Sequence, residues 1–508
     1  MRGKKLLKNI LLALVYQTIA ISSGFIIPKA IIKTYGSSIN GLVSSITQFL
    51  AYIYLAEGGV SVVIKYLLYK PIAENNKNEI EKILKSAKKF LKHILYIYII
   101  YVLLLCVIYP QIVSKNFETY FTITLVIVIA ISRFAEYFMA MEYNLFLQAK
   151  QQIYIISIAS SISVILNTIL TIVLIKLNCS IITIKIANAI VFIVRSQLYK
   201  IYVKSKYKID LSKKIENYEI KQKRDAFVQQ LAYIIDTNID VVLITCFLST
   251  TEVSVYTVYM LVLKGIKNIV NATIGGVDSA FGDMFAKKEY KNIDEKFTIY
   301  QFIYYSIITL LYTLCLLLII PFIQVYTNGI TDANYCRPVF AIIVTIGEFI
   351  WAIKLPYETI VSSAGHFRQT KNLSCIEAMV NVILSVCLIA KFGIIGTAIG
   401  TLAAMGIKAL MVVYYFSKNI LNRNLKVDLK FLMVILIQSL IIIFIGTFIL
   451  GKSTITSYIS WALVAIKLGV VALIVECFIG FIFYRKIIFE MITSFKEKRK
   501  IALQLSKK

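Results

Sequence analysis

The sequence predicts an all-α polytopic membrane protein with fourteen transmembrane helices. Hydrophobic residues make up 59% of the 508 positions, whereas soluble domains usually contain about 45–50% apolar residues. The apolar residues fall into blocks of about 20 residues, which short polar or basic pieces separate. These blocks do not alternate apolar and polar residues, as the strands of a closed β-barrel would. Membrane-spanning helices are therefore the expected elements.

The fourteen expected spans follow one another along the whole chain. Their approximate limits are 9–32, 40–63, 91–113, 119–143, 153–175, 180–199, 226–247, 253–278, 298–325, 338–362, 374–390, 394–416, 431–450 and 458–484. The first begins in MRGKKLLKNILLALVYQ, which resembles a signal peptide. Its apolar run continues to Ile32 without a cleavage-like site, so we expect an uncleaved first span.

The positive charges predict how these spans are oriented. The formal net charge is +28, and with the N-terminus inside, 40 of the 55 Lys and Arg lie on inner segments and 7 on outer ones. This split agrees with the positive-inside rule, so both termini and every long loop are expected in the cytoplasm. The basic residues flank apolar spans instead of forming a folded basic surface. They therefore favour contact with anionic lipid headgroups and exclude nucleic acid as a partner.

Two halves of the chain resemble each other at a constant offset of 214 residues, which places Asn167 on Asn381 and the turn 35–43 on residues 249–257. Transporters built from parallel repeats commonly place the substrate between them, so two lobes around a central cavity are expected. The expected parts are an N-lobe of six spans (1–206), a basic cytoplasmic linker (207–225), a C-lobe of six spans (226–420), two added spans (421–484) and a basic cytoplasmic tail (485–508).

The inner loop YKPIAENNKNEIEKILKSAKKFLKH is amphipathic. Five apolar residues fall on one helical face, with lysines opposite: Ile80, Ile83, Leu84, Ala87 and Leu91. Amphipathic helices with a basic polar face lie in the membrane interface. We therefore expect this segment on the inner headgroup layer.

Charged residues inside the expected spans are the main candidates for function. A Lys or Arg at the bilayer centre costs about 2.5–3.5 kcal/mol, so it must face protein or water. The eighth span carries one polar stripe at helical spacing: Lys264, Lys267, Asn268, Asn271, Gly275 and Asp278. Lys185 and Asn188 share a face of the sixth span. Polar stripes on several helices can all avoid the lipid only if they face a shared water-filled cavity.

These cations allow two interpretations. Two cations have an acid one helical turn away, namely Arg133 with Glu136 and Lys354 with Glu358. Each pair could be a structural ion pair or part of a binding site. The acid nearest to Lys264 and Lys267 on their stripe is three to four turns away, and an unpaired cationic stripe in a low-dielectric cavity suits phosphate or pyrophosphate. The residues expected to contact a pyrophosphate or its sugar are Lys264, Lys267, Arg133, Lys185, Lys354, Asn268 and Asn271.

Three carboxylates are candidates for binding a coupling ion. Asp236 and Asp240 lie one helical turn apart in the seventh span, which suits a shared proton or Na⁺. Glu57, in LAEGGVSV, could bind such an ion or cap a basic residue of the inner loop. Pro28 should kink the first span, and Lys29 beyond it could guard the outer mouth as a gate or meet headgroups.

The sequence does not indicate an enzyme. It contains no Walker motif, no His-Glu-x-x-His and no nucleophile elbow. The eight cysteines contain no Cys-x-x-Cys. We expect no catalytic residue, metal, disulfide or cofactor, with transport driven by a Na⁺ or H⁺ gradient or by the membrane potential.

Five segments resemble one known family: GFIIPKAIIKTYGSSINGLVSSITQFLAYIYLAEGGV, DTNIDVVLIT, GVDSAFGDMFAK, TDANYCRPVFAII and PYETIVSSAGHFRQTK. Over nearly its whole length the chain resembles the polysaccharide (O-antigen and capsule) flippases of the multidrug/oligosaccharidyl-lipid/polysaccharide exporter superfamily. The resemblance implies two six-helix lobes with two further helices around a cationic cavity. It also implies export of undecaprenyl-pyrophosphate-linked oligosaccharide across the bacterial cytoplasmic membrane by alternating access, alongside polysaccharide polymerase and export proteins.

Three alternatives stay open. A multidrug exporter of the same superfamily would favour an acidic or aromatic cavity, because its substrates are often cations. A flippase for lipid II would share the architecture and the substrate charge. A polysaccharide polymerase or glycosyltransferase would need sizeable outer loops, whereas here the long loops are expected inside.

Overall fold

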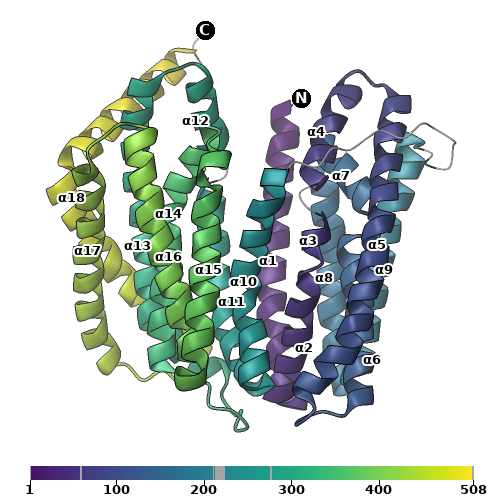
Figure 1. Ribbon diagram of the computed structural model, residues 1–508. Helices are drawn as coiled ribbons and strands as arrows, with labels where there is room; N and C mark the ends of the chain where they lie inside the picture. Colours follow the sequence, from purple (N-terminus) through teal and green to yellow (C-terminus); the bar gives the residue numbers. More distant parts are fainter. Residues whose placement is uncertain (1, 58–59, 210, 212–223, 275–276, 506–508) are drawn as a thin grey trace. The chain divides into compact units, whose positions relative to one another are not determined.

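The computed structural model describes residues 2–57, 60–209, 211, 224–274 and 277–505, which form eighteen α-helices and contain no strand (Figure 1). The helices are α1 (Arg2–Tyr35), α2 (Ser37–Ala51), α3 (Tyr54–Glu57), α4 (Val60–Ala73), α5 (Lys77–Val113), α6 (Thr119–Tyr137), α7 (Met141–Ala149), α8 (Ile153–Lys176), α9 (Ile181–Tyr207), α10 (Arg224–Phe247), α11 (Thr250–Ile274), α12 (Val277–Ala286), α13 (Tyr290–Tyr326), α14 (Pro338–Ser363), α15 (Phe367–Phe392), α16 (Ile394–Asn419), α17 (Leu425–Gly451) and α18 (Tyr458–Leu505). The prediction of an all-α protein is confirmed for this part of the chain.

Twelve of the described helices are long and apolar enough to cross a membrane. Two expected spans lack such a helix. The span at 40–63 is divided among α2, α3 and α4, because the backbone at Tyr52 and Ile53 makes tight i→i+3 turns. The span at 226–247 corresponds to α10, whose apolar part, Thr237–Phe247, is short. The count of fourteen therefore stays a prediction.

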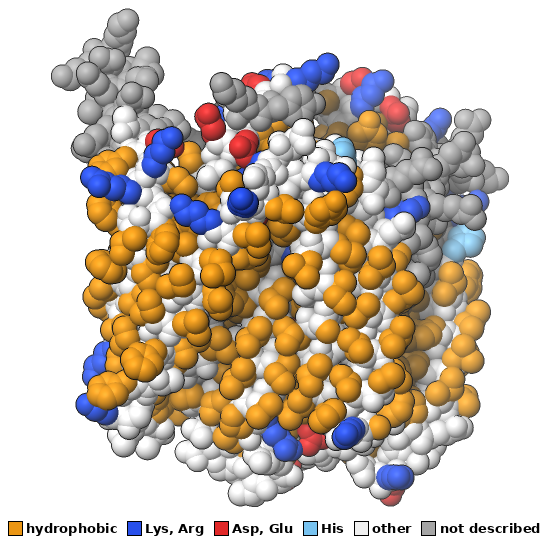
Figure 2. Space-filling view, turned by 60° about the vertical axis from the view of Figure 1, so that its left-hand side comes forward, with side chains coloured by type: hydrophobic (Ala, Val, Ile, Leu, Met, Phe, Trp, Pro, Cys, Tyr) orange, Lys and Arg blue, Asp and Glu red, His pale blue; other side chains and the backbone are white. Residues whose placement is uncertain are grey.

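The surface has the polarity of a membrane protein. Figure 2 shows apolar side chains across the middle of one face, with Lys and Arg gathered towards its two ends. Apolar belts of this kind match the hydrocarbon core of a bilayer, and basic residues match its headgroups. The chain is a multi-pass membrane protein.

The chain divides into two compact units. Unit 1 contains residues 1–261, 329–334 and 389–394, and unit 2 contains residues 262–328, 335–388 and 395–508. In unit 1, α1 packs along α8, and α6 packs along α9, while α10 lies against α2. In unit 2, α13 packs against α14, α17 and α18.

The amphipathic segment before the third expected span does not lie on headgroups. It forms the start of α5, a 37-residue helix about 55 Å long, whereas the hydrocarbon core is about 30 Å thick. The five apolar residues of its predicted face are at most 8% exposed. Four of them share a buried cluster with residues of α4 and α7, which pack against α5, and Leu91 belongs to a second buried cluster. The predicted periodicity is correct. The predicted partner is wrong, since neighbouring helices cover this face.

Local sequence explains where several helices begin. The side chains of Asn76, Ser180 and Asn424 accept hydrogen bonds from backbone N–H groups two or three residues later, at the starts of α5, α9 and α17. Such caps satisfy N–H groups that have no partner within the helix. Pro28 lies inside α1, which is continuous from Arg2 to Tyr35, and a kink there stays a prediction.

Candidate functional site

The predicted polar stripe of the eighth span lies on α11. Lys264, Asn268 and Asn271 are exposed, and Lys267 is half-buried. Residues three, four and seven apart share one helical face, so these four side chains form the polar face of α11. Gly275 is outside the described residues, and the side chain of Asp278 is not described either.

Lys267 has an acidic partner on another helix. Its ammonium lies 2.8 Å from the carboxylate of Glu348 on α14 and 4.3 Å from the ring centroid of Trp351. The expectation that Lys267 lacks an acidic partner is therefore wrong. The spacing of acids along one stripe cannot show this partner, because helix packing brings Glu348 from 81 residues away.

Lys354 belongs to a buried ring of alternating charges in unit 2. Its ammonium bonds Glu377 on α15 and lies 3.5 Å from Glu358, one turn along α14. Lys408 on α16 closes the ring, at 3.0 Å from Glu358 and 2.6 Å from Glu377. Two lysines and two glutamates leave no net charge, so this geometry favours the structural ion-pair interpretation of Lys354.

Unit 1 contains a group of cations that has fewer acidic partners than the charge ring of unit 2. We call it the unit 1 cation group, and its members are Arg133, Lys185 and Arg195. Arg133 on α6 bonds Glu136 at 2.7 Å. On α9, Arg195 is 6% exposed and donates to the backbone carbonyl of Glu136 at 2.9 Å. Lys185, also on α9, is half-buried, and the positive charge of Arg133 repels its ammonium. No described carboxylate forms an ion pair with Lys185.

Aromatic rings surround these cations. Tyr54 and Tyr137 meet edge to face at 4.9 Å between centroids, and Arg133 lies 5.9 Å from the Tyr137 ring. The Arg195 guanidinium lies 4.9 Å from the ring of Phe192, which shares its helix face. Arginine beside aromatic rings can bind an anionic group and stack on a flat apolar face at the same time.

Of the three predicted coupling carboxylates, Asp240 is the one whose side chain the structure describes. It is 7% exposed and accepts a hydrogen bond of 2.9 Å from the Tyr256 hydroxyl, within unit 1. The side chains of Asp236 and Glu57 lie outside the described part of the chain. Pro28 and Lys29, the predicted gate, are half-buried on α1.

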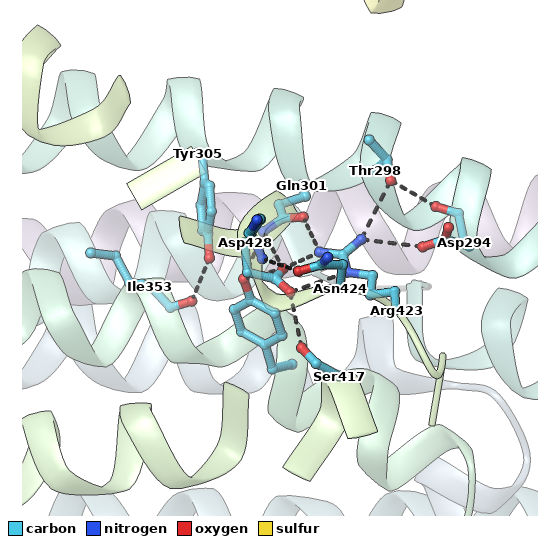
Figure 3. A network of polar contacts seen from close by, with 11 residues as sticks. Asp294, Thr298, Gln301, Tyr305, Ile353, Ser417, Arg423, Asn424 and Asp428 are labelled. Atoms are coloured by element: carbon cyan, nitrogen blue, oxygen red, sulfur yellow. Dashed lines mark hydrogen bonds and ion pairs between the residues drawn. The ribbon is translucent and has the colours of Figure 1, made fainter. Parts of the chain in front are cut away.

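A further polar network was not predicted. Arg423, in the connection between α16 and α17, donates to Asp428 and also to Gln301 (3.0 Å), Asp294 (3.2 Å) and Thr298 (3.5 Å) on α13 (Figure 3). Burial alone would lower the pKa of the Arg423 guanidinium, but its hydrogen bond to the Asp428 carboxylate raises it. Arg423 is thus fixed as a cation.

Asp428 joins this network to two further helices. It is 1% exposed and accepts hydrogen bonds from Tyr357 on α14 and Ser417 on α16, both at 2.9 Å. Four helices therefore meet at one carboxylate. In the sequence, Arg423 and Asp428 are a cation and an acid five residues apart at the start of an expected span. That spacing could have indicated an ion pair, whereas the positive-inside pattern treats Arg423 only as a charge of an inner loop.

The described residues contain no group of three or more His, Cys, Asp or Glu side chains that could hold a metal ion. The charged clusters that they do contain are ion pairs and hydrogen-bond networks between helices. They show no nucleophile–base pair that would indicate catalysis.

No protein-family model matches the sequence, and no curated protein matches it. Solved structures do. The lipid II flippase MurJ in an inward closed conformation has a TM-score of 0.68 at 18% identity, covering 94% of this chain and 100% of that chain. An inward-facing multidrug resistance transporter of the MATE family and MOP superfamily has a TM-score of 0.62 at 14% identity, covering 81% and 98%. The MATE multidrug transporter DinF-BH has a TM-score of 0.56 at 14% identity, covering 83% and 97%.

At these identities the likeness defines the fold. The chain has the same fold as the lipid II flippase MurJ and as multidrug transporters of the MATE family. The three solved structures named above are a flippase and two multidrug transporters.

Proposed function

We propose that the chain is a flippase that moves an undecaprenyl-pyrophosphate-linked oligosaccharide repeat unit from the inner to the outer leaflet of the bacterial cytoplasmic membrane. It would work by alternating access, with fourteen spans and both termini in the cytoplasm. A Na⁺ or H⁺ gradient or the membrane potential would drive it, since one charge crossing 100 mV is worth about 2.3 kcal/mol. The fold shared with a lipid II flippase over 94% of the chain supports this proposal.

One observation carries the choice of an anionic substrate. The unit 1 cation group contains three cations, and in their described contacts only Arg133 pairs with a carboxylate, that of Glu136, while Arg195 donates to the Glu136 backbone carbonyl. Positive charge inside a membrane protein needs a compensating anion, and a pyrophosphate offers several acceptor oxygens for charge-assisted hydrogen bonds. A cationic drug would be repelled by the same group.

A lipid II flippase is the second candidate. MurJ matches 94% of this chain, whereas the two multidrug transporters match 81% and 83%. A flippase of a lipid-linked anion therefore accounts for more of the chain than a drug exporter does. Lipid II and an oligosaccharide repeat unit differ in their sugars, and the sugar is what separates the two candidates.

The predicted residues take proposed roles within this scheme. Arg133 and Lys185 would hold the pyrophosphate, with Lys264, Asn268 and Asn271 on the exposed face of α11 as further contacts. Lys267 could join them by exchanging Glu348 for the substrate. Lys354 would act indirectly, through the charge ring of unit 2. Coupling is assigned to Asp240 with Asp236 and Glu57, and gating to Pro28 and Lys29.

A complementation experiment tests the proposal. The protein is expressed in a bacterium that lacks its O-antigen flippase and supplies a matching repeat unit, and surface polysaccharide is measured. We expect rescue by the wild type and at least a tenfold loss with Arg133→Ala plus Lys185→Ala at equal membrane abundance. Lys467→Ala is the matched control, since Lys467 is an exposed cation on α18, outside the unit 1 cation group.

Two parallel arms separate the alternatives. Rescue of a strain depleted of its lipid II flippase, without rescue of surface polysaccharide, would establish the second candidate. Increased resistance to cationic drugs with neither rescue would make the chain a drug exporter. If the variant with Arg133→Ala plus Lys185→Ala rescues as well as the wild type, the unit 1 cation group does not bind the substrate.

A further inference from the structure

A seam of short polar side chains joins α2 to α10 and α11 within unit 1. We call it the α2 seam, and its hydrogen-bonded pairs are Ser38 with Thr251 (2.7 Å), Asn40 with Ser254 (2.8 Å) and Ser45 with Thr245 (2.6 Å). Asn40, Ser45, Thr245 and Ser254 are buried. None of these six residues is charged, so each pair can separate without leaving an unpaired charge.

The two sides of the seam approach very closely. A Cβ atom built on Gly41 would lie 1.6 Å from the carbonyl oxygen of Thr250, so glycine is required at this position. Short side chains and close backbones make contacts that either form completely or are lost when the helices shift by a few ångströms. The seam is therefore suited to two states, closed and open.

The seam lies where the two repeats meet. Asn40 and Ser254 are separated by 214 residues, which is the offset that relates the two halves of the sequence. Residues that contact their own counterparts lie at a two-fold axis. A repeat with this offset would account for a contact between equivalent positions of α2 and α11.

One charged residue breaks this symmetry. Asp332, between α13 and α14, accepts hydrogen bonds from the backbone N–H of Ser37 (2.6 Å) and from its hydroxyl (2.7 Å). Its carboxylate therefore sits at the N-terminus of α2, where the helix dipole favours negative charge. Residues 329–334 belong to unit 1, so this contact lies within one unit.

The repeat counterpart of Asp332 makes no such contact. Adding 214 to 118 gives 332, so Glu118 is the equivalent acid. Glu118 is exposed, and its side chain forms no capping bond at α6. At α11, Ser249 accepts the bond from the Glu252 N–H. The acidic cap is thus present on one side of the seam alone among the described residues.

We propose that Asp332 is a latch that holds the α2 seam closed, and that the transport cycle must break this latch to open the seam. The inference rests on the alternating access of the proposed function and adds a positioning residue that does not touch the substrate. Because the seam pairs are neutral and Asp332 makes two charge-assisted hydrogen bonds at the start of α2, Asp332 sets how often the seam opens.

Cysteine labelling of the purified full-length protein in nanodiscs tests the latch. Ser254→Cys is the reporter, in a background where all eight native cysteines are serine, so its reaction rate with a small maleimide measures the open fraction. Loss of two charge-assisted hydrogen bonds should raise that rate at least about tenfold in Asp332→Ala. Asp332→Asn, which keeps the shape and removes the charge, should raise it by a smaller factor. Glu118→Ala is the matched control and should leave the rate unchanged.

The outcomes are distinct. Equal labelling rates in the wild type, Asp332→Ala and Asp332→Asn would overturn the latch, and so would an equal rise in Glu118→Ala. Labelling reports the seam and not transport. Faster labelling of Asp332→Ala, combined with a wild type that does not rescue surface polysaccharide, would therefore support the latch and refute the proposed substrate.

Discussion

Lys267 on α11 is held between the carboxylate of Glu348, at 2.8 Å, and the ring of Trp351, one turn further along α14, at 4.3 Å. The side chain of Lys267 is 23% exposed and that of Glu348 is 5% exposed. A carboxylate that holds a lysine in this way competes with any anionic ligand for the same ammonium. Any anion that binds Lys267 would therefore have to displace Glu348.

Removing that competitor should change anion binding. We expect Glu348→Gln to tighten the binding of inorganic pyrophosphate several-fold, because Lys267 then has no acid to neutralise it, and to lower stability by about 1–3 kcal/mol. Isothermal titration and thermal unfolding of the purified protein measure the two effects. In the double variant with Lys267→Met, both effects should largely disappear. A gain in affinity that persists there would mean that Lys267 is not the ligand.

The charge ring of unit 2 should behave as one structural element. Removing the charge of Glu377 by Glu377→Gln leaves Lys354 and Lys408 with Glu358 as their shared acid, and we expect a loss of about 3 kcal/mol in unfolding free energy. Lys354→Met added to it should recover part of the loss, since both changes belong to the same ring. Denaturant unfolding in detergent measures this coupling. Strictly additive losses would show that the ring members act independently.

The network around Arg423 offers a second test of buried charge. Arg423→Ala should leave the Asp428 carboxylate, which is 1% exposed, without its cation and lower the unfolding free energy by about 3–5 kcal/mol. Asp428→Asn combined with Arg423→Met should be milder, because no unpaired charge stays buried. Thermal unfolding compares the two. A single variant as stable as the wild type would show that the network contributes nothing to the fold.

The start of α5 distinguishes helix packing from headgroup contact. Leu84 is 0% exposed, so Leu84→Ala should lower the unfolding free energy by about 2–5 kcal/mol. Lys88→Ala, one turn further on at an exposed position, is the control and should change it by no more than about 0.5 kcal/mol. Both values should be the same in neutral and anionic lipid. A Leu84→Ala effect that appears only with anionic lipid would restore the headgroup interpretation.

How far the sequence predicts this molecule depends on the range of each interaction. Apolar blocks and the 3.6-residue period are local, so the helices and the apolar face of α5 can be read directly from the chain. Partners such as Glu348 for Lys267, or Glu377 for Lys354, come from other helices, and no spacing along one span identifies them. Asp332 and Ser37 are 295 residues apart, and only the fold brings them together.

Gly41 provides the last prediction, since its backbone lies very close to the first residue of α11. Gly41→Ala would place a methyl group 1.6 Å from the Thr250 carbonyl oxygen, which forces the helices apart and should hold the α2 seam open. We expect labelling of Ser254→Cys to rise at least about tenfold and rescue of surface polysaccharide to be lost, while the protein stays folded because the core of each helix is unchanged. Gly24→Ala is the control, because a Cβ there meets no atom within 4 Å. If Gly41→Ala labels and transports like Gly24→Ala, closure of the seam is not part of the cycle, because the added methyl group leaves no way for these two backbones to keep their close contact.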